Sequence, residues 1–120
     1  MLVLRDAQLA VLAAPLLGEL RAWLHPHLRK HFGGRLKSTD DASLDALIDA
    51  GVTRALEHGA RRSPSICKFV YMRVLFDERF EALPWAAATL ARTDIRDPDT
   101  KIETLYILAR RELASRGGVR

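Results

Sequence analysis

Apolar residues recur every three or four positions along most of the chain. Leucine and alanine supply most of these positions, and β-branched residues are few. No stretch alternates apolar and polar residues over the length of a strand, whereas the observed spacing places apolar side chains on one face of a helix. The sequence therefore predicts an all-α fold, a compact bundle of four to five helices.

The first periodic segment runs from about residue 6 to residue 31, and two prolines interrupt it. Pro15 and Pro26 each remove a backbone N–H donor and crowd the preceding turn. We expect either one long helix, kinked at Pro15 or Pro26, or two helices broken near a proline. The apolar stripe of this segment consists of Leu9, Leu12, Ala13, Leu16, Leu20, Trp23 or Leu24, and Leu28.

The second predicted helix follows Asp40 and Asp41, which supply capping oxygens and negative charge for a helix start. Its apolar stripe continues to Gly59, where the helix is expected to stop. Gly51 lies on the apolar face, and glycine costs about 1 kcal/mol in helix propensity. The missing side chain predicts a close approach by another helix.

Three more helices are predicted in the second half of the chain. The third begins with Ser63 as its N-cap and Pro64 at the first helical position, and it should end near residue 76. A charged connector separates it from a short helix over residues 84–92. After a turn rich in aspartate, the last helix continues to Gly117 and Gly118.

Length and composition favour one domain spanning residues 1–120. The chain is 48% hydrophobic and 28% charged, which suits a single core. Its one cysteine, Cys67, cannot form an internal disulfide, so we expect a cytoplasmic location. Arg5, Asp6 and Glu19 interrupt the apolar N-terminus, so neither a signal peptide nor a membrane span is predicted.

Recognisable catalytic and metal-binding motifs do not occur in the sequence. His27 and His31 have the i, i+4 spacing of a zinc pair, but the segment offers no further ligand. Cys67 has no neighbouring histidine in sequence to activate it, and a buried thiol is expected. We expect no cofactor, no metal and no catalytic activity, while an active site assembled from distant residues remains an alternative.

Positive charge gathers in two stretches that contain no acidic residue. The formal net charge is +4, and these stretches lie between Glu19 and Asp40 and between Glu57 and Asp77. If the first and third helices converge, the two stretches form one positive surface for phosphate or for an acidic protein. A solvated basic face is the simpler interpretation. The candidate contact residues are Arg21, Arg29, Lys30, Arg35, Lys37, Arg61 and Arg62.

Four aromatic residues surround the charged connector: Phe69, Phe76, Phe80 and Trp85. Most of this group should be core. Trp85 follows Pro84 at the start of the short helix, and an exposed Trp85 would mark a protein-binding hot spot.

Residues 47–54 superficially resemble the centre of a DNA-binding helix-turn-helix. The apolar stripe, however, continues through Gly51 without a change of phase, which favours one uninterrupted helix.

Three short segments together resemble a bacterial protein group. They are His27–Phe32, Gly51–Gly59, and Phe76-Asp77 followed by Pro84-Trp85-Ala86 and Leu90. The order of elements resembles small helical bacterial proteins of unassigned biochemistry that are associated with type VI secretion effector and spike genes. The resemblance implies an accessory role as an effector-binding adaptor, a chaperone or an immunity-type partner, with no catalytic residues to transfer.

We therefore expect a non-catalytic interaction module. Its basic surface or an aromatic edge around Trp85 would dock another protein, such as a secretion-system effector. The alternative is a nucleic-acid-binding helical domain whose arginines contact phosphate, and its affinity for duplex DNA would weaken steeply with salt. Assembly into a homo-oligomer is left open.

Overall fold

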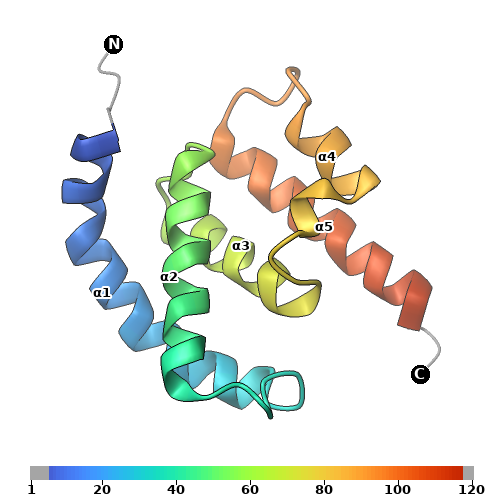
Figure 1. The fold of residues 1–120 in the computed structure, drawn as a ribbon. Coiled ribbons are helices and arrows are strands. Elements are labelled where there is room, and N and C mark those ends of the chain that lie inside the picture. Colours follow the sequence, from blue (N-terminus) through green and yellow to red (C-terminus); the bar gives the residue numbers. More distant parts are fainter. Residues whose placement is uncertain (1–5, 118–120) are drawn as a thin grey trace.

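The computed structural model describes residues 6–117 of the chain and the side chains of residues 17–115. Over this range the fold contains helices and no strand, so the predicted all-α bundle is confirmed. Figure 1 shows the order of the elements. They are α1 (Asp6–His31), α2 (Asp41–Glu57), α3 (Ser63–Leu75), the 3₁₀ turn η1 (Phe80–Ala82), α4 (Pro84–Leu90) and α5 (Pro98–Gly117).

Helix α1 continues through both prolines. It is one helix of 26 residues, so the first of the two sequence-based alternatives is correct. Its two halves point in different directions in Figure 1. A proline bends a helix where it removes a hydrogen bond, and Pro15 and Pro26 account for a bend of this kind.

Helix α2 has the ends that its sequence predicts. The Asp40 carboxylate caps the first turn by accepting a hydrogen bond from the Ser43 N–H at 2.7 Å. The helix ends at Glu57, and Gly59 follows with a φ of +98°. Glycine adopts this left-handed conformation without the steric cost that a Cβ would bring.

Two predicted boundaries in the second half need correction. Ser63 is not the N-cap of α3 but its first residue, and Arg62 occupies the cap position with no side-chain capping bond. The short helix α4 ends at Leu90 rather than Arg92, and the predicted connector contains η1. An aspartate of α5, Asp99, instead holds the two residues before α3 through their backbone N–H groups.

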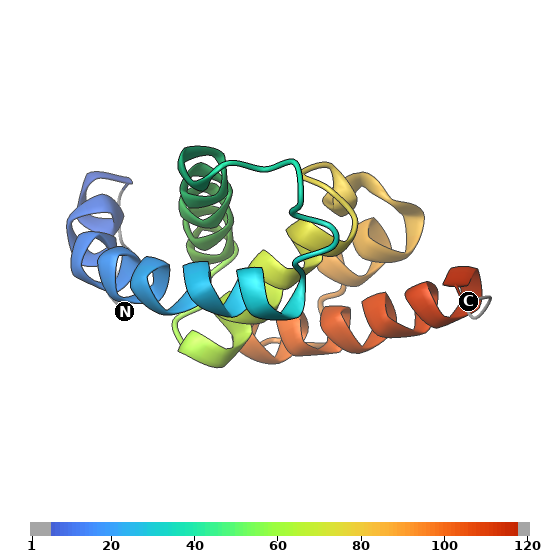
Figure 2. The same ribbon diagram turned by 90° about the horizontal axis from the view of Figure 1, so that it is seen from below.

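The helices form a flattened body of 48 × 35 × 20 Å. Figure 2 shows α2 and α4 on one side, α1 and α5 on the other, and α3 passing between them. Helix α3 packs on α1, α2 and α5. Its side chains Ile66, Phe69, Val70 and Met72 are fully buried at the centre of the core.

Within the described part of the chain, no helix combines the length and the apolar character that a membrane crossing requires.

Candidate interaction groove

Two of the three predicted basic residues on α1, Arg21 and Arg29, are engaged within the chain. Arg21 forms a two-pronged ion pair with Asp49 of α2, at 2.8 Å from Nε and 2.6 Å from Nη2. Arg29 donates to the Leu36 and Thr39 carbonyls at 3.0 and 2.6 Å and pairs with Asp41 at 2.9 Å. These two guanidinium groups fasten α1 to α2 and to the turn between them.

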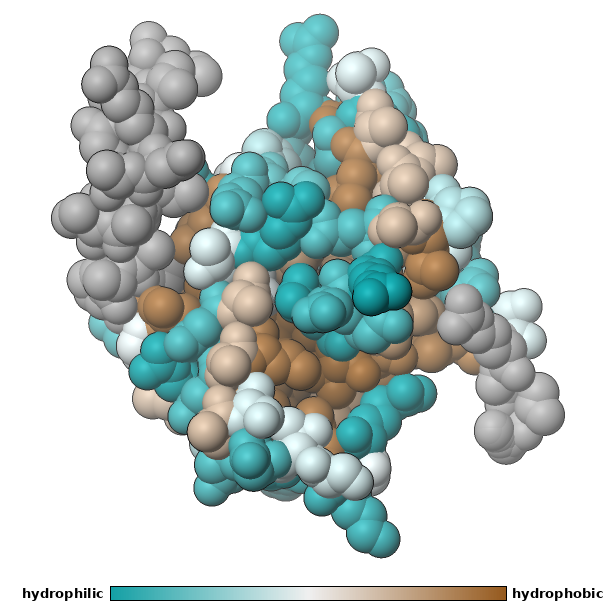
Figure 3. Space-filling model, in the orientation of Figure 1, coloured by the Kyte–Doolittle hydropathy of each residue, from teal (hydrophilic) through white to brown (hydrophobic). Residues whose placement is uncertain are grey.

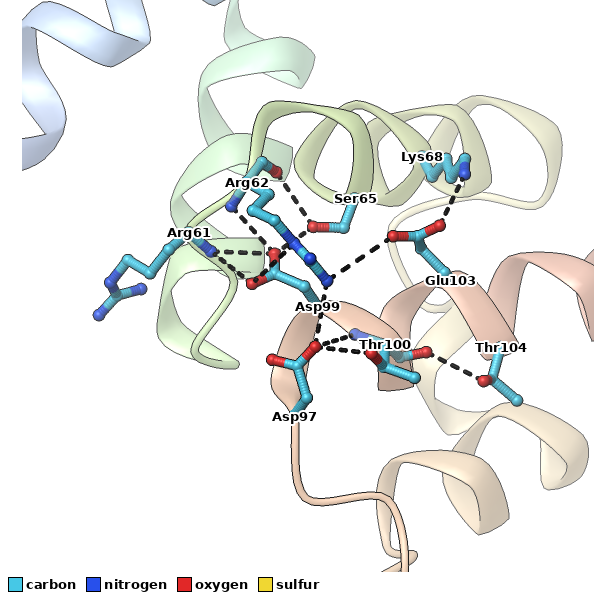
Figure 4. Close-up of polar contacts among 9 residues, drawn as sticks. All are labelled: Arg61, Arg62, Ser65, Lys68, Asp97, Asp99, Thr100, Glu103 and Thr104. Atoms are coloured by element: carbon cyan, nitrogen blue, oxygen red, sulfur yellow. Dashed lines mark hydrogen bonds and ion pairs between the residues drawn. The ribbon is translucent and has the colours of Figure 1, made fainter.

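Asp99 connects the start of α5 to the start of α3 (Figure 4). It is only 6% exposed, and it accepts hydrogen bonds from the backbone N–H groups of Arg61 and Arg62 at 3.0 Å and from the Ser65 hydroxyl. Burial raises the pKa of Asp99, but the bonds from Ser65, Arg62 and Arg61 outweigh burial and hold the pKa below its usual value. The N–H groups before α3 thus bond to an ionised carboxylate from α5.

The Arg62 side chain extends this network across the surface. It pairs with Asp97 at 3.1 Å and lies 4.0 Å from Glu103, whose carboxylate also accepts a bond from Lys68 at 3.1 Å (Figure 4). Every carboxylate of this network is bonded to cations or to N–H and O–H donors. The cluster stabilises the contact between α3 and α5, and its acids offset the charge of Arg62 and Lys68.

Arg35 and the Arg61–Arg62 pair, which come from the two basic stretches, lie at opposite ends of α3. Arg35 donates to the Leu75 carbonyl at the last residue of α3, whereas Arg61 and Arg62 precede the first residue. A helix of this length separates its ends by about 20 Å. Lys30, in the last turn of α1, and Lys37, two residues after Arg35, are exposed.

Trp85 contributes to packing instead of forming an open aromatic edge. Its ring centroid lies 5.2 Å from that of Phe76, and the half-buried side chain packs against the core. The indole Nε1 is buried without a hydrogen-bond partner among the described residues.

The exposed tryptophan is Trp23 of α1. Its exposed fraction is 52%. Trp23 and Leu20 form one wall of a groove of about 450 Å³, and Pro64, Cys67, Lys68 and Tyr71 line the α3 side. Figure 2 shows the first turns of α3 beside the middle of α1. A hydrophobic groove bordered by an exposed tryptophan has the composition of a binding hot spot.

A stack of rings holds Trp23 in place. The Trp23 and His27 ring centroids are 4.3 Å apart, and His27 Nε2 lies 3.1 Å from the Tyr71 hydroxyl. Burial lowers the pKa of His27, assisted by the positive charges of His31 and Lys30. Burial raises the pKa of Tyr71 to about 12. The His27 and Tyr71 rings beside Trp23 are thus mostly uncharged near neutral pH.

Cys67 at the floor of the groove is buried, as its sequence context predicts. Burial raises the pKa of its thiol to about 11, so the nucleophilic thiolate is scarce at neutral pH. Among the residues that the structure describes, no cluster of three or more His, Cys, Asp or Glu side chains is placed to hold a metal ion. The geometry of the groove suits binding of an apolar surface.

Sequence reasoning placed Trp23 on the apolar stripe as an alternative to Leu24. Leu24 is fully buried and takes the core position, which leaves Trp23 beside it on the surface. The useful signal was the four-residue spacing of Trp23 and His27, which puts both rings on one face of α1.

Comparison with known proteins gave no match to a family model, to a curated protein or to a solved structure.

Proposed function

We propose that this protein is a non-catalytic interaction module that holds an acidic, amphipathic helix of another protein in the groove between α1 and α3. The observation that carries this proposal is Trp23, which is half exposed and fixed by stacking on His27 at the edge of an apolar groove. Rigid tryptophan side chains give large contact areas at a small entropic cost.

The shape of the groove favours a helical partner. Two helices form its walls, and Leu20, Cys67 and Tyr71 present an apolar lining between them. An amphipathic helix lays its apolar residues, spaced three and four apart, into grooves of this kind.

The charge around the groove favours acidic residues on that helix. Lys68 is the one charged side chain among the described residues of the lining, and it shares the Glu103 carboxylate with Arg62, so that carboxylate offsets part of the local positive charge. The whole chain carries a formal charge of +4. Complementary charge mainly raises the association rate and fixes the orientation of a partner.

The resemblance to proteins associated with type VI secretion supplies a class of partner. Under that part of the proposal, the bound helix belongs to a secreted effector, and the protein acts as its adaptor, chaperone or immunity-type partner in the cytoplasm. The proposal for the groove does not depend on this class of partner, because apolar area and charge decide what the groove binds.

The nucleic-acid alternative receives less support from the contacts. Arg21, Arg29 and Arg62 are paired with carboxylates, and phosphate would have to compete with those acids. Binding to duplex DNA that weakens steeply with salt, and that Lys30 and Lys37 substitutions reduce, would favour this alternative.

The test places a photo-crosslinking amino acid at position 63, an exposed residue of the groove lining, in the source cell, so that Trp23 stays in place. The expected result is one protein cross-linked at position 63, followed by binding of the purified pair with a dissociation constant that Trp23→Ala raises at least about tenfold. A cross-link only to a second copy of this chain, or to nucleic acid, would contradict the proposal, as would an absence of any cross-linked protein.

Ile107 provides the matched control. It is a similarly exposed apolar residue on α5, 54% accessible, and it does not line the groove. A cross-linker at position 107 should not capture the same protein, and Ile107→Ala should leave the dissociation constant unchanged.

A further inference from the structure

A second cavity, of about 700 Å³, lies between α2 and the end of α3. It shares no lining residue with the Trp23 groove. Leu47 of α2 and Val74 and Phe76 at the end of α3 give it an apolar floor. Figure 3 shows hydrophobic surface in a hollow beside α2, with hydrophilic residues around it. A cavity of this size is within the range of small-molecule sites.

Arg73 lines this cavity without a partner. Its Nε is buried and has no hydrogen-bond acceptor, and the guanidinium forms no ion pair with any side chain in residues 17–115. Its Cδ lies 3.2 Å from the position that a Cβ on Gly51 would occupy, so the side-chain stem is wedged against α2. Because the Nε is closed off from solvent, a ligand oxygen would bond to the terminal Nη groups of Arg73, which have no partner among residues 17–115.

Arg35 lines the same cavity from the turn that follows α1. Its side chain donates one hydrogen bond, from Nη1 to the Leu75 carbonyl at 3.2 Å, and the other guanidinium N–H groups form no further bond within the described range. By contrast, Arg21 and Arg92 both have two-pronged bonds to a carboxylate. Two guanidinium groups that form no ion pair within the described structure therefore line one cavity.

The remaining charged groups of the lining limit the charge of a ligand. Asp77 and Glu78 also line the cavity, and neither forms an ion pair with Arg35 or Arg73 in the described structure. Their negative charges oppose a dianion more strongly than a monoanion. Arginine forks bind carboxylate and phosphate alike, so the neighbouring acids favour the singly charged carboxylate.

We propose that this cavity binds a small monoanionic carboxylate with an apolar chain. The carboxylate bonds to Arg73 and Arg35, and the chain covers Leu47, Val74 and Phe76. This site is independent of the Trp23 groove, so either proposal can fail without the other.

Sodium hexanoate is the probe for this site, followed by two-dimensional amide NMR of the full chain. The expected result is a saturable set of shifts around residues 73–76 and the α2 residues of the cavity. Arg73→Met keeps the apolar stem and Arg35→Met changes an exposed residue, and each should raise the dissociation constant at least about fivefold. Arg96→Met, an exposed arginine outside the cavity, should leave it unchanged.

Two other probes keep an alkyl chain of similar length and change the charge of the ligand's head group. Hexylammonium should leave these amide resonances unshifted, and hexyl phosphate, a dianion at about pH 8, should bind more weakly than hexanoate. The proposal is overturned if hexanoate causes no saturable shift, if hexylammonium binds as tightly, if hexyl phosphate binds more tightly, or if both Arg→Met variants bind hexanoate like the Arg96→Met control.

Discussion

Val70 fills the space that a side chain on Gly51 would need. Its Cγ2 atom lies 2.9 Å from the ideal Cβ position of Gly51, and its Cα lies 3.4 Å away. Both residues are buried where α2 crosses α3. The close approach that a glycine on an apolar helix face predicts is therefore confirmed, and it fixes the distance between the two central helices.

Gly51→Ala should destabilise the protein by up to about 2 kcal/mol, although alanine is the better helix former. The new Cβ would overlap a branched, buried valine, and overpacking of this kind costs about 1–3 kcal/mol against a propensity gain of about 1 kcal/mol. Gly51→Leu should cost more and prevent cooperative unfolding. Urea denaturation followed by circular dichroism measures both.

Gly18→Ala is the control for the helix-propensity term. An added Cβ at this position of α1 meets no atom within 4 Å. This variant should stabilise the protein by about 0.5–1 kcal/mol. If Gly51→Ala were equally stabilising, the packing of α2 on α3 described here would be incorrect.

Asp99→Asn should destabilise the protein by about 2–4 kcal/mol, because it replaces a buried carboxylate that accepts several hydrogen bonds. Asp97→Asn, at a carboxylate whose side chain is 52% exposed, should cost much less. Urea denaturation at neutral pH gives the comparison. Equal costs for the two variants would show that the Asp99 bonds contribute little.

The stability cost of Asp99→Asn should depend on pH. The pKa of Asp99 in the folded protein is lowered from 3.8, so its contribution to stability is present above pH 3.8 and is lost as the pH falls through the folded value. The difference in unfolding free energy between wild type and Asp99→Asn should therefore shrink in acid.

The helices were predictable from sequence because their signals are local. Apolar spacing, the Asp40 cap and the stop at Gly59 each involve residues within a few positions of one another. The Ser63 boundary was missed because the bonds that shape the start of α3 come from Asp99, which is 37 positions away from Arg62. A long-range acceptor leaves no signal in the local sequence.

The candidate sites were less predictable for the same reason. Arg21 looks like a free cation in sequence, yet it pairs with Asp49, 28 positions later. Arg73, by contrast, carries no distinguishing mark in the sequence, and only the fold shows its buried Nε without an acceptor. Which basic residues are available to a partner is decided by contacts between distant segments.

The pKa of His25 in α1 should lie above the ordinary histidine value of 6.5, and the pKa of His27 should lie below it. The hydrogen bond to Asp45 raises the pKa of His25, against burial, with a further bond to Asp41, whereas burial lowers the pKa of His27. The imidazole proton shifts in NMR should show a midpoint above 6.5 for His25 and below it for His27. A common midpoint would contradict these surroundings.

The raised pKa of His25 also determines how its contribution to folding stability changes with pH. A raised folded value means that the contribution of His25 is fully present below pH 6.5 and is lost as the pH rises through the folded pKa. The stability advantage of wild type over His25→Asn should therefore be larger in mildly acidic solution than at alkaline pH. Asp45→Asn should remove most of this dependence, because Asp45 supplies the leading bond.

Trp23 and Trp85 should differ in their access to a soluble quencher. Trp23 is 52% exposed on α1, whereas Trp85 packs against Phe76 and the core. In Trp85→Phe, the remaining Trp23 fluorescence should be strongly quenched by acrylamide. In Trp23→Phe, the Trp85 fluorescence should be quenched less and emit at shorter wavelength. Trp23→Ala should cost about 1–2 kcal/mol in stability, less than a fully buried tryptophan would, since about half of the side chain is already in water. A larger loss would mean that Trp23 stabilises the fold itself, and the reverse order of quenching would leave the α1–α3 groove without its exposed anchor.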